Sequence, residues 1–141
     1  MPRYMLDTNM CIYLMKNQPE EVAQRFAQCH VGDVVISAIT YAELAFGVAV
    51  STNPEQERAN LAALVEDIPV AAFDAPAGLT YAQIRLATRE NRKDALDKLI
   101  AAHASALGVT LVTNNMRDFA KYPGVMTENW LEPVHSKRSR T

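Results

Sequence analysis

Four carboxylates lie at junctions between predicted elements of secondary structure. They are Asp7, Glu43, Asp97 and Asp118. In a parallel α/β sheet, ligands collect beyond the carboxyl ends of the strands, so acids at such junctions can converge although they are distant in sequence. Converging carboxylates repel one another, and a hard divalent cation relieves that repulsion. Because oxygen ligands favour Mg²⁺ or Mn²⁺ over zinc, we expect one acidic cation site.

The chemistry that suits such a site is hydrolysis of a phosphodiester bond. A bound cation lowers the pKa of a water molecule, orients it in line with the phosphate and neutralises charge there. The sequence suggests no Ser/His/Asp or Cys/His arrangement that would supply a protein nucleophile instead.

Each acid also has an ordinary structural explanation. Asp7 could cap the following helix, Glu43 could face solvent, and Asp97 could complement the dipole of its own helix. The apolar neighbours of Glu43 argue against simple exposure, and Asn9 is available as a cap in place of Asp7. Asp118 by itself favours neither interpretation. The functional interpretation therefore depends on the four acids taken together.

Short apolar segments alternate with helical patterns, which is typical of a parallel α/β sheet. Strands are predicted at 4–6, 34–36, 70–73 and 109–112, with a weaker fifth at 125–127. Helices are predicted at 10–16, from 19, from 37 towards 50, after 54, at 79–89 and at 94–107. Asn9, Ser37 and Asp94 are the predicted N-caps, and Gly108 ends the last helix. We expect one domain at 1–132 and a mobile basic tail at 133–141.

The net charge of the 141 residues is −2, so overall charge gives no indication of nucleic-acid binding. A nuclease must then carry its positive charge locally. Arg85, Arg89, Arg92 and Lys93 are spaced to share one face of a helix, if the helix extends that far. They could follow the phosphates of RNA, and an ordinary solvated face is the alternative.

The apolar content of 49% predicts a packed core, yet no apolar stretch reaches the roughly 18–20 residues of a membrane span. With no signal peptide visible, we expect a cytoplasmic protein. Cys11 and Cys29 lack the spacing of metal ligands and are expected to be free thiols. His103 lies about 240° around its helix from Asp97 and is expected to pack in the core rather than share a cation.

Three long segments resemble those of a known family. They are YMLDTNMCIYLMKNQP at 4–19, VVISAITYAELAFGV at 34–48 and DALDKLIAAHASALGVTLVTNNMRDFAKYPGVMTENW at 94–130. In this order and spacing they resemble the motifs of VapC-type PIN-domain toxins, over nearly the whole chain up to residue 130. The resemblance implies a PIN-like α/β fold, with a central parallel sheet of four to five strands flanked by helices. It also implies a Mg²⁺- or Mn²⁺-dependent endoribonuclease.

The resemblance assigns roles to individual residues. It maps the family's four acids onto Asp7, Glu43, Asp97 and Asp118, and Asp7 and Asp97 are the expected metal ligands. The polar residues expected behind the metal or against the substrate are Thr8, Asn9, Thr113 and Asn115. As the toxin of a type II toxin–antitoxin system, the protein is expected to form a homodimer, to cut RNA and to be silenced by a cognate antitoxin. Several relatives cut tRNA.

One position departs from the family pattern. Relatives often carry a small residue or glycine before the third acid, whereas this chain has Asp94. Asp94 could raise the pKa of Asp97, add an outer contact to the metal site or simply cap the helix, and we favour the cap.

Three other functions remain open from the sequence. A haloacid-dehalogenase-like phosphatase also places an acid after its first strand, but it usually needs a second acid where this chain has Asn9. An inactive PIN fold that serves only as a binding module would be expected to have lost some of the four acids. A metal-dependent DNA nuclease on the same scaffold is compatible with all these features.

Overall fold

The computed structural model describes residues 1–132, so the tail predicted at 133–141 lies outside the described residues. At its centre is a sheet of five parallel strands in the order β3-β2-β1-β4-β5. The strands are β1 (Tyr4–Leu6), β2 (Val34–Ser37), β3 (Val70–Ala71), β4 (Thr110–Val112) and β5 (Thr127–Glu128). The predicted α/β class with a parallel sheet is confirmed.

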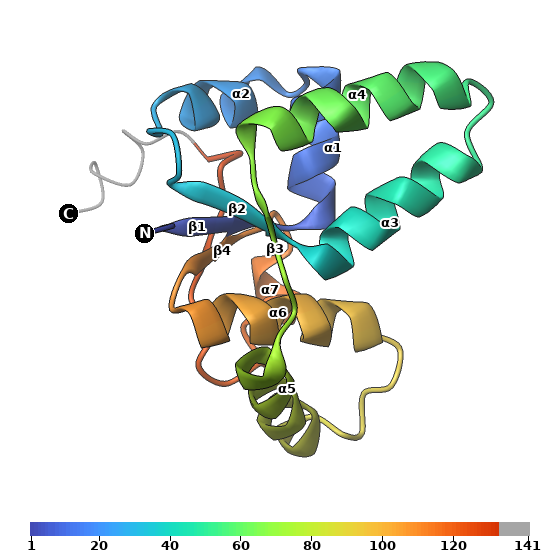
Figure 1. Cartoon of the computed structure of the whole chain (residues 1–141). Coiled ribbons are helices and arrows are strands. Elements are labelled where there is room, and N and C mark those ends of the chain that lie inside the picture. The colour runs from blue at the N-terminus through green and yellow to red at the C-terminus, as the bar shows by residue number, and fades with distance from the viewer. Residues whose placement is uncertain (133–141) are drawn as a thin grey trace.

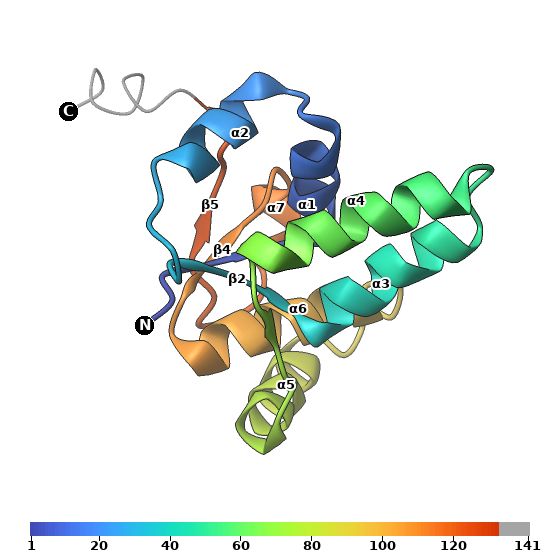
Figure 2. The same cartoon turned by 45° about the horizontal axis from the view of Figure 1, so that its top comes forward.

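Helices cover both faces of this sheet. They are α1 (Thr8–Lys16), α2 (Glu20–Ala27), α3 (Ala38–Ala49), α4 (Pro54–Asp67), α5 (Ala75–Ala87), α6 (Ala95–Leu107) and α7 (Met116–Phe119). Helices α1, α2 and α4 pack on one face, and α5 and α6 on the other (Figure 1). Helix α3 continues from β2 and pairs with α4 in a hairpin that projects beyond the sheet, as Figure 2 shows.

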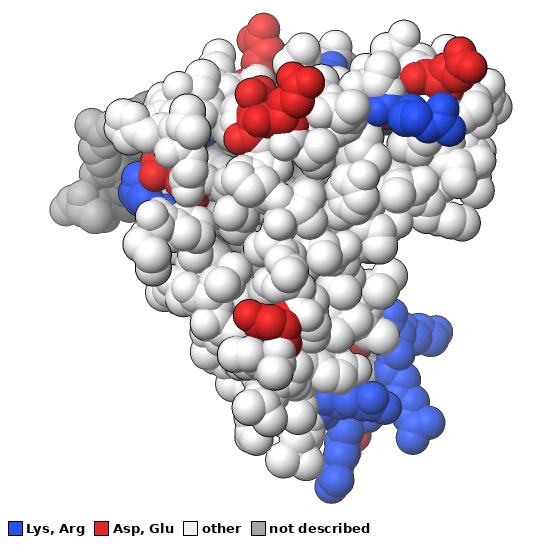
Figure 3. Space-filling model, in the orientation of Figure 1, with Lys and Arg blue, Asp and Glu red and all other residues white. Residues whose placement is uncertain are grey.

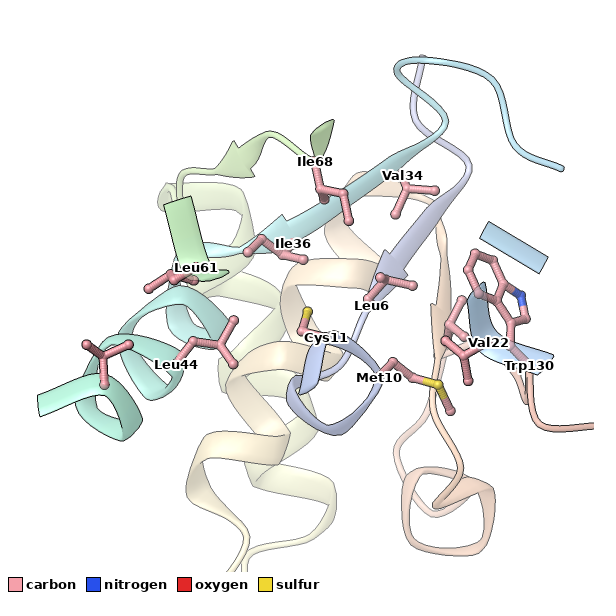
Figure 4. Packing of buried hydrophobic residues seen from close by; sticks show 12 residues of the cluster. Leu6, Met10, Cys11, Val22, Val34, Ile36, Leu44, Leu61, Ile68 and Trp130 are labelled. Atoms are coloured by element: carbon pink, nitrogen blue, oxygen red, sulfur yellow. The ribbon is translucent and has the colours of Figure 1, made fainter. Parts of the chain in front are cut away.

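Each face of β1 is buried in a hydrophobic core, because successive side chains of a strand point to opposite faces. Leu6 belongs to the cluster under α1, α2 and α4, together with Ile36 and Trp130 (Figure 4). Met5 belongs to a second cluster, with Ile100 of α6. All five side chains are 2% exposed or less. The two cores fix the central strands, so the loops after β1 and β4 begin from rigid positions.

The start of α1 differs from the prediction. The helix begins at Thr8, and its N-cap is Asp7 rather than Asn9, because the Asp7 carboxylate accepts a hydrogen bond from the Met10 N–H at 2.9 Å. The predicted cap of α3 is confirmed, since the Ser37 hydroxyl accepts a hydrogen bond from the Ile39 N–H in the first turn of that helix at 3.0 Å. Asp7 therefore has a structural role whatever its chemistry.

Both ends of α5 also differ from the prediction. The helix begins at 75 rather than 79, because Asp74 caps it by accepting a hydrogen bond from the Ala77 N–H at 3.2 Å. It ends at 87, where the Thr88 hydroxyl donates to the Ile84 carbonyl at 2.7 Å. The prediction of one basic helical face is therefore wrong. Only Arg85 lies in α5, and the other three basic residues, Arg89, Arg92 and Lys93, follow it in the connection to α6.

Smaller differences concern the edges of the sheet. Strand β3 has two residues rather than four, β5 lies at 127–128 rather than 125–127, and the short helix α7 was not predicted. Two expectations about single residues are confirmed: His103 is buried with its Nδ1 2.8 Å from the Ser37 Oγ, and both cysteines are free. Among the described helices, none has the length and apolar character needed to cross a membrane.

Candidate active site

The carboxyl ends of β1 and β4 are neighbours, since these two strands are paired in parallel. Asp7 directly follows β1, and its backbone N–H donates to the Val112 carbonyl at the end of β4 at 3.0 Å. Thr113 comes next in the chain, is fully buried and hydrogen-bonds to the Asp7 carboxylate. The same hydroxyl accepts the Asn115 N–H at 2.9 Å. Two loops that are distant in sequence are thereby joined around one carboxyl group.

Asp7 is a buried acid, with 6% of its surface exposed. Its pKa is raised from 3.8 to about 6, chiefly because burial disfavours the charged form. Hydrogen bonds from Thr113 and the Met10 N–H lower this pKa, and the charges of Asp97 and Glu43 raise it. Asp7 therefore carries a charge that the metal-free fold accommodates poorly.

Asp97, in the first turn of α6, is also shielded from solvent in part. Burial is the main cause that raises its pKa. The charges of Glu43, Asp94 and Asp118 raise it further. The positive charge of Lys121 lowers the pKa of Asp97. The predicted acids thus influence one another electrostatically although they come from four different elements.

The other two acids are held by hydrogen bonds from predicted site residues. The Thr8 hydroxyl donates to the Glu43 Oε1 at 2.7 Å. The Asn115 amide donates to the Asp118 Oδ2 at 2.8 Å. Asn9 differs, because its side chain is exposed and, within residues 1–132, hydrogen-bonds to none of the four acids. Three of the four polar residues singled out in the sequence therefore contact an acid.

Asp94 does not act as the simple helix cap that we favoured. It stands at the N-cap position of α6, but its side chain caps no backbone N–H. Its carboxylate instead accepts a hydrogen bond from the Tyr122 hydroxyl and forms ion pairs with Lys98 at 3.2 Å and Lys121 at 3.8 Å. Burial raises the pKa of Asp94, but the Tyr122 and Lys98 hydrogen bonds outweigh it and lower the pKa overall. Because its charge raises the pKa of Asp97, the simple cap is wrong and the electrostatic alternative is supported.

Lys98 is a buried cation that sequence analysis did not single out. It is 4% exposed, and besides its ion pair it donates to the Thr88 carbonyl at 3.0 Å and to the Asn91 carbonyl. It thus ties the connection between α5 and α6 to the start of α6. The only local signal in the sequence is its position four residues after Asp94.

The donor chemistry of the acids suits Mg²⁺ or Mn²⁺, because all of their donors are oxygens. In the described part of the chain, no three His, Cys, Asp or Glu side chains are grouped so as to hold a metal ion by themselves. Mg²⁺ does not require such a group, since it keeps several waters and is usually bound by one or two carboxylates. Asp7 and Asp97 fit that requirement, because both are shielded and the charge of Asp97 acts on Asp7.

Comparison with known proteins agrees with this geometry. The family model of the PIN domain matches residues 4–125. The chain is 37% identical to the tRNA(fMet)-specific endonuclease VapC of Salmonella typhimurium, over 92% of this chain and 99% of the relative. It is 39% identical to the protein of the same name from Shigella flexneri, with the same coverage. Ribonuclease VapC2 of Rickettsia felis is 34% identical, over 90% of this chain and 97% of the relative. The chain therefore belongs to the PIN-domain family and, within it, to the VapC ribonucleases.

Similar solved structures support the same family assignment. The DNA-bound VapBC of Salmonella typhimurium matches with a TM-score of 0.85 and 37% identity, over 92% of this chain and 99% of that one. VapBC2 of Rickettsia felis, bound to a DNA fragment from its promoter, matches with a TM-score of 0.80 and 33% identity, over 90% and 98%. The predictions of a PIN-like fold, a VapC-type family and an endoribonuclease class are confirmed.

Proposed function

We propose that this VapC-family protein cuts RNA as a metal-dependent toxin whose acidic site is Asp7, Glu43, Asp97 and Asp118. The observation that carries the proposal is that Asp7 and Asp97 are shielded from solvent beyond the carboxyl ends of β1 and β4, where the charges of neighbouring acids further raise their pKa values. Carboxylates held together against their repulsion are the arrangement that a divalent cation stabilises.

Asp7 and Asp97 are the proposed ligands of Mg²⁺, for which Mn²⁺ can substitute. When bound, the cation supplies an activated water and neutralises charge on the scissile phosphate. The chain orients three of its acids through neighbouring donors, which are Thr113 for Asp7, Thr8 for Glu43 and Asn115 for Asp118. These bonds limit rotation of the carboxylates and so reduce the reorganisation that the reaction needs.

The substrate class that we propose is tRNA, with initiator tRNA as the first candidate. The Salmonella and Shigella relatives are named for cleavage of tRNA(fMet), and the Rickettsia relative is named a ribonuclease. These names favour RNA over the alternatives of a DNA nuclease and a phosphatase. All four acids are present, which argues against an inactive binding module.

We also propose a homodimer that acts in the cytoplasm and is silenced by a cognate antitoxin. The similar solved structures from Salmonella and Rickettsia are VapBC assemblies. The electrostatics offer a route to inhibition, because an acidic site attracts an Arg or Lys from a partner. Such a cation would pair with Asp7 or Asp97 in place of the metal.

The test is incubation of the purified protein with initiator tRNA and, separately, with an elongator tRNA in Mg²⁺. We expect discrete fragments from initiator tRNA, no fragments in EDTA, and a rate for Asp97→Asn that is lower by about 10² or more. Asp74→Asn is the matched control, because it removes an exposed carboxylate that likewise caps a helix, and it should cut normally. Intact RNA in both Mg²⁺ and Mn²⁺ would contradict the proposal, as would full activity in EDTA.

A further inference from the structure

A second feature of the surface lies outside the acidic site. A groove of about 740 Å³ separates the second half of α5 from the start of α6. Arg85, Arg89 and Arg92 line it, and none of its lining residues is Asp or Glu. Figure 3 shows Lys and Arg side chains gathered over the same corner of the molecule, near the connection from α5 to α6. On a chain of net charge −2, this is a strong local concentration of positive charge.

We infer that this groove binds the phosphate backbone of the RNA substrate beside the acidic site, an assignment that rests on the proposed function. The three arginines are exposed, and within residues 1–132 none of them forms an ion pair. The Arg85 guanidinium donates one hydrogen bond to the Tyr81 hydroxyl at 3.4 Å. With no carboxylate partner, the three guanidinium groups can still bind phosphates, which they match with two parallel donors. By contrast, Arg3 and Arg25 are engaged by carboxylates.

The groove reaches the start of α6, the helix that also carries Asp97. Ala95 and Lys98 line the groove, whereas Asp97 lies outside its lining, about 200° around the helix from Ala95 and about 100° from Lys98. An RNA strand bound to the arginines would therefore lie beside the helical turn that carries one of the proposed metal ligands, on an adjoining face of α6. The groove and the acids have different roles. The arginines bind phosphates that are not cut, and the acids act on the phosphate that is cleaved.

Lys98 maintains the groove rather than binding phosphate itself. Its ammonium group already has three partners, the carboxylate of Asp94 and the carbonyls of Thr88 and Asn91. Those carbonyls belong to the connection that carries Arg89 and Arg92, so the buried lysine fixes the position of both arginines. Leu86, which is 61% exposed, adds an apolar wall against which a ribose or base can pack.

The test compares two double variants that each remove two positive charges. Arg85→Gln/Arg92→Gln alters the groove, whereas Lys16→Gln/Arg58→Gln alters exposed residues of α1 and α4 on the other face of the sheet. Binding of a fluorescently labelled tRNA transcript is measured by anisotropy in EDTA over a range of KCl concentrations. The groove variant should bind about tenfold more weakly at physiological salt, with a log–log salt slope smaller by about 1.4–1.8. The control should keep the slope and affinity of the wild type.

Measurements of tRNA cleavage rates distinguish a failure of this inference from a failure of the proposed function. In Mg²⁺, the groove variant should show a raised KM and a nearly unchanged kcat, because the arginines do not touch the scissile phosphate. If the wild type cuts tRNA and both double variants bind with equal slopes, the groove assignment is wrong and the nuclease stands. If the wild type cuts no RNA, the proposed function fails. The salt slopes of the two double variants still decide the groove assignment in that case: a smaller slope for the groove variant supports it, and equal slopes contradict it.

Discussion

Replacing Asp7 with Asn removes a charge from the acidic site and almost no volume. With a pKa of about 6 in the fold against 3.8 ordinarily, ionised Asp7 destabilises the metal-free protein by about 3 kcal/mol. Solvent screens little of this, because Asp7 is 6% exposed. Asn keeps the cap on the Met10 N–H but loses a helix-dipole interaction of roughly 0.5–1 kcal/mol. The variant should therefore gain about 2 kcal/mol of unfolding free energy near neutral pH.

The pH dependence of this gain identifies its cause. The folded pKa of Asp7 lies above the unfolded value, so the folded chain holds the proton more tightly. The stability due to this group is complete below its unfolded pKa of 3.8 and is lost as pH rises through about 6. Asn has no proton to lose. The difference between the variant and the wild type should be close to zero near pH 3.5, below the unfolded pKa, and reach its full value near pH 7.5.

The assay is urea unfolding in EDTA at both pH values. Trp130 is the only tryptophan and is 1% exposed, so its fluorescence reports loss of the core. Asp74→Asn serves as the control, because this exposed residue caps α5 as Asp7 caps α1, and its loss should give no stabilisation at either pH. An Asp7→Asn protein that is less stable than the wild type at neutral pH would refute the reasoning, as would a gain that is the same at both pH values.

Three further predictions follow from the same contacts. Mg²⁺ at about 100 times its Kd should stabilise the wild type by about 2.7 kcal/mol in urea unfolding, and Asp97→Asn should lose most of that effect; an equal shift in both would remove Asp97 from the metal site. Lys98→Met should lower the unfolding free energy by about 2–4 kcal/mol, because Asp94 and two carbonyls lose their donor. Amide exchange should rise at 88–94 in that variant, and unchanged exchange there would count against the role given to Lys98. Induced expression should arrest growth unless a cognate antitoxin is co-expressed or the protein carries Asp7→Asn, and equal growth in all cases would exclude a toxin.

The sequence predicted the central strands because they depend on local patterns, and it identified the four candidate acids from their positions next to predicted elements. Tyr4–Leu6 and 109–112 are short apolar segments between turn residues. Asp7 directly follows the first segment, and Asp118 follows the second by six residues. The start of α5 was missed because Asp74 and Pro76 resemble loop residues, although both are favourable at a helix N-terminus.

The role of Asp94 could not be predicted from its neighbours. Its partner Tyr122 lies 28 positions further along the chain and reaches it only once α7 and α6 have packed. The burial of Lys98 depends likewise on carbonyls from the preceding connection. Patterns of spacing identify a helix start, but they do not show which distant donor will compete for its carboxylate. The shared basic face was predicted on the condition that the helix extends past residue 89, and the local Thr88–Ile84 contact ends α5 before three of the four basic residues.

The most direct test of the acidic site is the position of a bound metal ion. Crystals of the wild type and of Asp97→Asn, soaked in Mn²⁺, should be compared by anomalous diffraction. We expect an anomalous peak within coordination distance of the Asp7 and Asp97 carboxylates in the wild type, beside the anchored Glu43 and Asp118, and a weak or absent peak in the variant. A peak held by other residues, or one of equal strength in the two proteins, would contradict the assignment of these acids as the metal site.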